Sequence, residues 1–208
     1  MSSGLSFAEL EAAAGVVIEI LKTIPEFSNS RIVIIGGLGL WRYIRNYRTT
    51  ESKTNCLLCH HLHSNKKLSF FYYKGSNGKL IQIDITPDWQ VRPLVALFVQ
   101  QYRFNGNLQS PYVPSAAIPI STVRPNALPY ISELDLLIFK INSCGLRPTP
   151  GKKLRDATDA SELLEDLSTK GPIVLSVSQK NVILQCLDDV ARMSGRDKAW
   201  WIAKLALN

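Results

Sequence analysis

The stretch that decides the fold reads Arg31-Ile-Val-Ile-Ile-Gly-Gly-Leu-Gly-Leu-Trp-Arg-Tyr43. Its first five residues are mostly β-branched, which favours a strand. The pair Gly36-Gly37 ends that run, and the apolar spacing from Leu38 to Tyr47 predicts a short helix. The sequence therefore predicts a strand, a diglycine turn and a helix in this order.

A β-hairpin is predicted further along the chain. Two β-rich runs, 68–74 and 79–86, are separated by Gly75-Ser-Asn-Gly78, which is a turn signal. The second run alternates isoleucine with polar residues, so its isoleucines share one face of the strand and Asp84 lies on the other. The hairpin thus predicts a strand with Asp84 pointing away from an isoleucine core.

Helices are predicted at both ends of the chain. Ser6 and Glu9 form a capping box before an apolar segment that continues to Ile24. Ser132 precedes a helix that ends at Cys144, with Gly145 as the residue after the cap. Further helices are predicted over 92–103, 153–168, 178–193 and 196–206.

These elements predict an α+β protein with a small mixed β-sheet flanked by helices and a helical C-terminal part. We expect residues 1–130 to form the α+β core with its N-terminal helix. Residues 131–208 are expected to pack on that core, so that the chain forms one compact unit.

Composition excludes several classes of protein. The chain has 208 residues, of which 46% are hydrophobic and 20% charged, as in ordinary folded proteins rather than disordered or disulfide-dense ones. No apolar run approaches the roughly 18 residues that a membrane helix needs. Residues 1–9 lack the basic and apolar regions of a signal peptide. We therefore expect a cytoplasmic protein without a membrane partner, whose four cysteines are thiols or metal ligands.

The positive charge is concentrated in one part of the chain. The net charge is +7, and the segment from Arg31 to Lys79 holds nine basic residues but a single acid, Glu51. Such a local excess favours an anionic partner, either a nucleotide or a nucleic acid. A solvated basic face is the alternative.

Several short motifs follow one another along the chain in an order that is typical of a known family. They are Val33–Tyr43, Arg48-Thr-Thr50, Phe71–Gly75, Ile81–Pro87, Leu134–Lys140, Arg147, Lys152-Lys153 and Asp156-Ala-Thr-Asp159. The set resembles fungal members of the polymerase-beta-type nucleotidyltransferase superfamily, whose bacterial relatives include toxin and abortive-infection nucleotidyltransferases. The resemblance covers roughly residues 31 to 165.

The resemblance implies roles for individual residues. Gly36 and Gly37 would let the backbone approach a triphosphate, because no Cβ stands in the way. Arg48 and Lys140 would supply cations for the nucleotide, and Asp84 would be the third carboxylate of a Mg²⁺ site. For Lys140 the alternative is a snorkelling lysine on an amphipathic helix, and for Asp156 and Asp159 it is the charged face of a helix.

The chain departs from the family where two further carboxylates are expected. The acidic pair would fall at about residues 52 and 54, and the chain has Ser52-Lys53-Thr54 there. Glu51 is adjacent, but neighbouring residues of a strand point to opposite faces. A cation at Lys53 also opposes the binding of Mg²⁺.

We therefore expect a nucleotidyltransferase-fold protein with a degenerate metal site, a pseudoenzyme that binds a nucleotide or another anionic ligand. An active nucleotidyltransferase, which would move a nucleoside monophosphate to a small molecule, protein or RNA, is the first alternative. A metal-binding or scaffold protein is the second.

One cysteine- and histidine-rich stretch is a separate metal candidate. Cys56, Cys59 and either His61 or His63 could supply ligands to zinc. All of them lie within eight residues, so a tetrahedral site would be strained. The alternative is a plain loop over 49–66.

Overall fold

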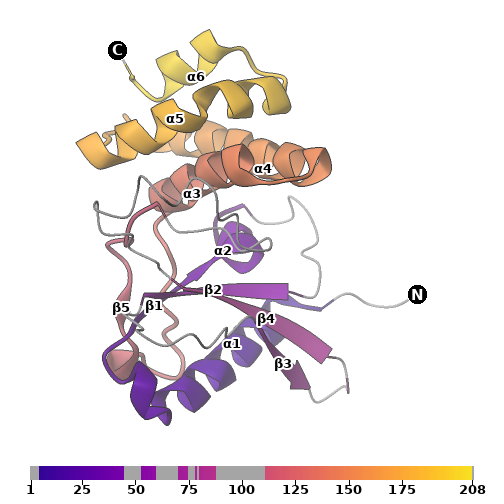
Figure 1. Cartoon of the computed structure of the whole chain (residues 1–208), viewed down its shortest axis with the longest axis vertical. Helices are drawn as coiled ribbons and strands as arrows, with labels where there is room; N and C mark the ends of the chain where they lie inside the picture. Colours follow the sequence, from indigo (N-terminus) through magenta and orange to yellow (C-terminus); the bar gives the residue numbers. More distant parts are fainter. Residues whose placement is uncertain are drawn as a thin grey trace, which may run out of the picture. The chain divides into compact units, whose positions relative to one another are not determined.

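The computed structural model describes residues 5–44, 53–59, 70–74, 78, 80–87 and 111–207, with 53–59, 70, 71 and 84–87 described through their backbone alone. The described residues form two compact units (Figure 1). The first holds the residues up to Ser132 apart from Pro111, and the second holds Pro111 and the residues from Glu133 onward.

The first unit is built around a five-stranded sheet in the order β3-β4-β2-β1-β5. The strands are β1 (Arg31–Ile35), β2 (Lys53–Cys59), β3 (Phe70–Lys74), β4 (Leu80–Pro87) and β5 (Ile118–Pro119). Strands β2 and β4 run parallel, and the other neighbouring pairs are antiparallel. The predicted α+β class with a small mixed sheet and a helical C-terminal part is confirmed.

The loop predicted over 49–66 is wrong for Lys53–Cys59, which form the central strand β2. This strand hydrogen-bonds to β1 on one side and to β4 on the other. Its sequence lacks a clear period-2 pattern, so the residues of β2 alone do not indicate a strand. Its pairing partners lie at least 20 residues away along the chain, and tertiary pairing decides its conformation.

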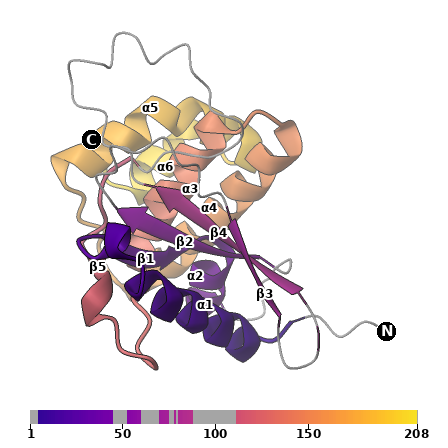
Figure 2. The same cartoon turned by 60° about the horizontal axis from the view of Figure 1, so that its bottom comes forward.

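Helix α1 (Phe7–Lys22) covers one face of the sheet, as Figures 1 and 2 both show. The predicted capping box is confirmed, because the Glu9 amide donates to Ser6 Oγ at 3.2 Å and the Ser6 amide donates to Glu9 Oε2 at 2.7 Å. Buried side chains of α1, including Leu10 and Leu21, share one apolar core with Ile81 and Ile83 of β4. A 3₁₀ turn, η1 (Pro25–Phe27), follows α1, and another, η3 (Ile120–Thr122), follows β5.

The second unit consists of helices. They are α3 (Glu133–Leu146), α4 (Pro150–Lys170), α5 (Val177–Ser194) and α6 (Lys198–Lys204). Helix α3 packs against α4 and α5, and α5 packs against α6. The four helices predicted for this part of the chain are present with shifted ends, whereas the helix predicted over 92–103 lies outside the described residues.

Gly145 does not follow the end of α3 as predicted, because the helix continues through it to Leu146. A Cβ at Gly145 would lie 2.7 Å from Sγ of Cys186 on α5. That distance is shorter than any ordinary contact, so the glycine lets the two helices approach closely.

This close approach gives a first prediction. We expect Gly145→Ala to lower the free energy of unfolding by about 1–3 kcal/mol, because the new methyl group overpacks the α3–α5 interface. The matched control is Gly151→Ala on α4, where nothing lies within 4 Å of the added Cβ. There the better helix propensity of alanine should add up to about 1 kcal/mol. Urea unfolding measures both, and a Gly145→Ala variant as stable as the parent protein would contradict the packing argument.

Candidate functional site

The candidate site of the first unit is a row of residues that crosses the sheet. Ile35 of β1 pairs with Asn55 of β2, Asn55 pairs with Asp84 of β4, and Asp84 pairs with Phe70 of β3. Neighbouring strands are about 4.8 Å apart, so the backbone at Ile35 lies roughly 10 Å from the backbone at Asp84. The sheet therefore places the end of β1 and Asp84 in the same row across the strands.

The diglycine turn begins directly after this row. Gly36 has φ +70°, a left-handed conformation that favours glycine, and helix α2 (Gly36–Tyr43) starts at the same residue. Among the residues that the structure describes, no side chain caps the first turn of α2. Amide groups in the first turn of a helix lack partners within the helix and attract anions. The predicted strand, diglycine turn and helix are thus present, with the helix starting two residues earlier than expected.

The rest of α2 is fixed by aromatic contacts within the first unit. Trp41 meets the ring of Phe7 edge-on at 5.8 Å between centroids, and the Arg42 guanidinium lies 4.7 Å from the centroid of Tyr130. The Tyr43 hydroxyl donates to the carbonyl oxygen of Ile131 at 2.6 Å. These contacts hold the C-terminal half of α2, and hence the orientation of its first turn, against the core.

The register of β2 identifies which of its positions lie on the same face of the sheet as Asp84. Thr54 is the partner of Ile83, whose side chain is fully buried, whereas Asn55 is the partner of Asp84. Lys53 is the partner of Gln82, one step further along the same face. Register partners share a face of a sheet, so positions 53 and 55 accompany Asp84. The family comparison of the sequence placed the acidic pair at 52 and 54 instead.

Several predicted site residues lie outside the described part of the chain. They are Arg48, Glu51, His61 and His63, together with the side chains of Cys56, Cys59 and Asp84. Cys56 and Cys59 stand in β2 rather than in a loop. The Mg²⁺ and zinc assignments of these residues therefore stay predictions. Elsewhere, in the ranges that the structure describes, no three His, Cys, Asp or Glu side chains are grouped so that they could hold a metal ion.

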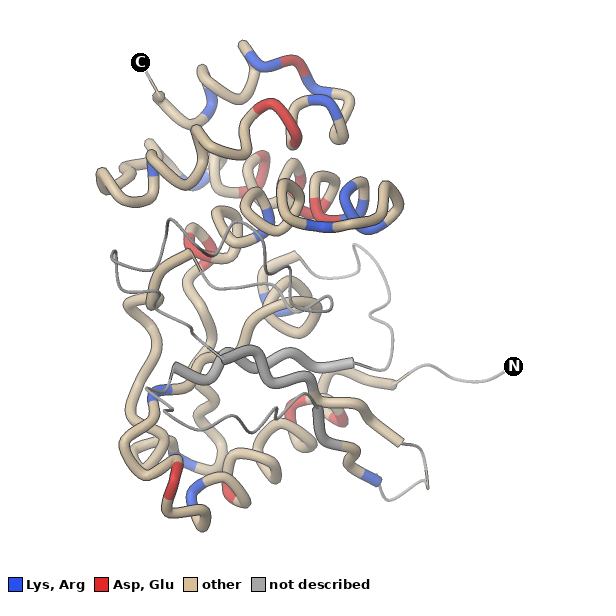
Figure 3. The backbone as a smooth tube through the Cα atoms, viewed as in Figure 1, with Lys and Arg blue, Asp and Glu red and all other residues tan. Residues whose placement is uncertain are grey.

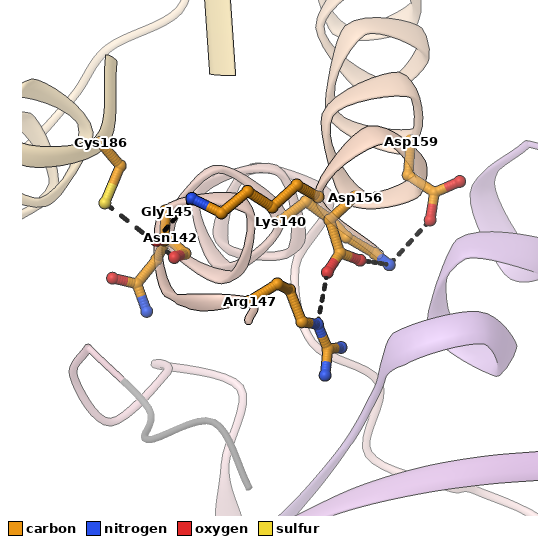
Figure 4. Close-up of polar contacts among 8 residues, drawn as sticks. Lys140, Asn142, Gly145, Arg147, Asp156, Asp159 and Cys186 are labelled. Carbon is orange, nitrogen blue, oxygen red and sulfur yellow. Dashed lines mark hydrogen bonds and ion pairs between the residues drawn. The ribbon is translucent and has the colours of Figure 1, made fainter. Parts of the chain in front are cut away.

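Lys140 lies in the second unit, within a buried cluster of charges (Figure 4). Its Nζ is 2.8 Å from Oδ1 of Asp156 and 2.7 Å from Oδ2 of Asp159, both on α4. Arg147 Nε donates to the other oxygen of Asp156, also at 2.8 Å. Two cations and two carboxylates thus balance each other between α3, the residue after it and α4.

The alternatives of a snorkelling Lys140 and of a charged helix face at Asp156 and Asp159 are both wrong. Lys140, Asp156 and Asp159 are 8%, 2% and 0% exposed. Burial raises the pKa of Asp156, but Lys140 and Arg147 oppose it more strongly, and the pKa is lowered from its ordinary value of 3.8. The Asp156 carboxyl group is therefore ionised at neutral pH. Because the charge of Lys140 is matched within the cluster, its role toward a nucleotide stays a prediction.

The two cysteines whose side chains the structure describes are structural. Cys144 and Cys186 are buried free thiols, and burial raises the pKa of Cys144 to about 12. Both stay protonated at neutral pH, which makes them poor nucleophiles and poor metal ligands.

Comparison with known proteins supports the fold. No family model and no curated protein matches the chain. The structure is similar to the crystal structure of an antigenic nucleotidyltransferase-like protein from Paracoccidioides brasiliensis, with a TM-score of 0.52 and 12% sequence identity. The match covers 99% of this chain and 96% of the other. At this identity the likeness shows the fold alone, so the chain has a nucleotidyltransferase-like fold. No described helix is long and apolar enough to cross a membrane.

Two features of the site were missed by sequence reasoning. Asn55 becomes visible as the partner of Asp84 only when β2 is known to be a strand in that register. The burial of Lys140 depends on carboxylates 16 and 19 residues further along the chain. Lys140, Asp156 and Asp159 belong to the motifs quoted from the sequence. The sequence around each residue does not indicate that α3 and α4 bring the three side chains into contact.

Proposed function

We propose that this protein binds a nucleotide, or another anionic ligand of similar chemistry, at the turn between β1 and α2. We propose further that it lacks the complete metal site of an active nucleotidyltransferase. The observation that carries the first part is the left-handed Gly36 at the start of an α2 whose first turn has no side-chain cap among the described residues. A phosphate group can approach such a turn closely and accept hydrogen bonds from its amides.

The residues at the Asp84 row do not fit a pair of Mg²⁺ ions. Divalent ions that bridge phosphates require several carboxylate oxygens close together. By register, Asp84 is accompanied by Asn55 in its own row and by Lys53 in the next. An amide is a weak neutral ligand, and an ammonium group repels a divalent cation. The proposed function is therefore binding, and no catalytic step through a metal follows from these residues.

Nucleotide binding is tested by calorimetric titration of ATP and of GTP at low and moderate salt. We expect weak binding, in the millimolar range, that decreases with added salt because it depends on charge. Gly37→Val should abolish the binding, since a branched side chain would stand between the turn and the phosphate. Gly37 is chosen because its φ, unlike that of Gly36, is not left-handed.

The control for this experiment is Gly151→Val, an exposed glycine of α4 with nothing within 4 Å of an added Cβ. It should bind as the parent protein does. Circular dichroism confirms that both variants are folded. Absence of heat at millimolar ATP and GTP would contradict the proposed binding and favour a scaffold role. A Gly37→Val variant that still binds would show that the diglycine turn has a structural role only.

A further inference from the structure

The β3–β4 hairpin has one covered face and one open face. Ile81 and Ile83 of β4 are 1% and 0% exposed and belong to the core beneath α1. On the alternate positions, Tyr72 and Leu80 are each 60% exposed, and Lys74 is exposed as well. We call the surface formed by the exposed side chains of Tyr72, Lys74 and Leu80, with the half-buried Gln82 beside them, the hairpin face.

The register shows that the hairpin face is continuous with the Asp84 row. Tyr72 pairs with Gln82, and Lys74 pairs with Leu80. Gln82 in turn pairs with Lys53 of β2. The next row along the strands is Phe70 and Asp84, about 7 Å away. A ligand lying on the hairpin face would therefore extend along the strands toward the candidate site.

The stretch of sequence that contains the hairpin carries charge of one sign. From residue 52 to residue 83 the chain contains five lysines and no aspartate or glutamate; these are Lys53, Lys66, Lys67, Lys74 and Lys79. The helical unit from Glu133 onward is nearly balanced, with eleven basic and ten acidic residues. Figure 3 shows the two signs interleaved along its helices. The hairpin thus belongs to the part of the chain that attracts anions.

The residue types on the face narrow the class of anion. An exposed aromatic ring offers a stacking surface for a base, and base stacking on tyrosine is a common way to hold single strands. The neighbouring Lys74, which is also exposed, can neutralise a phosphate. A protein partner on this face would instead be expected to present acidic groups to lysine and an apolar group to the ring. The combination of an exposed ring and an exposed lysine on one strand surface fits a nucleic acid better.

We propose that the hairpin face binds single-stranded nucleic acid, with a base stacked on Tyr72 and a phosphate beside Lys74. This inference is independent of nucleotide binding at the diglycine turn, because an oligonucleotide without a triphosphate suffices to test it. Duplex should bind less well, since its bases are not available for stacking on a side chain.

The test is fluorescence anisotropy with labelled 12-mers of uridine, of thymidine and of a mixed-sequence duplex. We expect the full chain to bind the single strands more tightly than the duplex. Tyr72→Ala should weaken single-strand binding about 5- to 100-fold through loss of stacking, whereas Tyr72→Phe, which keeps the ring, should stay close to the parent protein. Lys74→Gln should lower the slope of log affinity against log salt by about 0.7.

Leu184→Ala on α5 is the matched control, because Leu184 is 54% exposed and lies in the other unit. It should bind as the parent protein does. Tyr72 is largely exposed, so its variants should keep the thermal unfolding midpoint. Absence of binding, equal affinity of Tyr72→Ala and the parent, or equal affinity for duplex and single strand would each overturn the proposal, the last two by showing that binding depends on charge alone.

Discussion

Incubated with labelled nucleoside triphosphates, Mg²⁺ or Mn²⁺ and a cell extract as acceptor pool, the protein is expected to transfer no nucleotide at a useful rate. By register, Asp84 is accompanied by Asn55 and Lys53 where an active site needs carboxylates. Without them, the charge that develops on the transferred phosphoryl group is not neutralised, which costs several kcal/mol of barrier. The rate should therefore be lower by about 10³-fold or more than with a complete site.

The register supplies the decisive variant pair. Lys53→Asp combined with Asn55→Asp places two carboxylates at the positions that accompany Asp84, and we expect labelling to return. Ser52→Asp combined with Thr54→Asp is the matched control, because Thr54 is the partner of the buried Ile83. Robust labelling by the unmodified chain that disappears in Asp84→Asn would refute the prediction and show that another acid, such as Glu51, completes the site.

The elements that the sequence predicts correctly are those with local signals. Ser6 and Glu9 satisfy each other's backbone groups at the start of α1 whatever the rest of the chain does. Gly36-Gly37 interrupts a β-branched run, and Gly78, with φ +77°, lies between two strands that pair. In each case a few neighbouring residues decide the conformation, so the pattern can be recognised without knowledge of the fold.

The features that sequence reasoning misses depend on distant partners. Strand β2 exists because β1 and β4 hydrogen-bond to its two edges, and its own residues carry no strand period. Gly145 looks like a helix terminus, but it lies inside α3, where Cys186 of α5 leaves no room for a Cβ. Which residue accompanies Asp84 follows from register, and a shift by one residue exchanges the faces.

The buried charge cluster gives the largest expected effect on stability. Lys140→Met keeps the side-chain volume but leaves Asp156 and Asp159 without their shared cation. Removing one partner of a buried ion pair costs about 3–5 kcal/mol, because the remaining charge stays buried without compensation. We expect a loss of this size in urea unfolding at pH 7. The matched control is Lys198→Met, which breaks an exposed pair with Asp188 and should cost at most about 1 kcal/mol.

Dependence on pH separates the loss of a charge pair from a simple packing defect. The pKa of Asp156 is lowered in the folded protein, so the stabilisation it provides is complete above 3.8 and is lost as the pH falls through the folded value. Without Lys140, burial is opposed only by Arg147, and the pKa of Asp156 should rise. The stability difference between the parent and Lys140→Met should therefore be greatest at pH 7 and shrink toward pH 4, as the carboxyl group of the variant takes up a proton.

A double-mutant cycle separates charge compensation by Lys140 from its packing. If Lys140 is needed because it compensates a buried carboxylate, then removing that carboxylate should remove part of the need. Asp159→Asn keeps the shape of the side chain and deletes its charge, so the double variant with Lys140→Met should lose less stability than the two single losses together. Strictly additive losses, or a deficit of Lys140→Met that stays constant between pH 7 and pH 4, would show that the lysine acts through packing rather than through its charge.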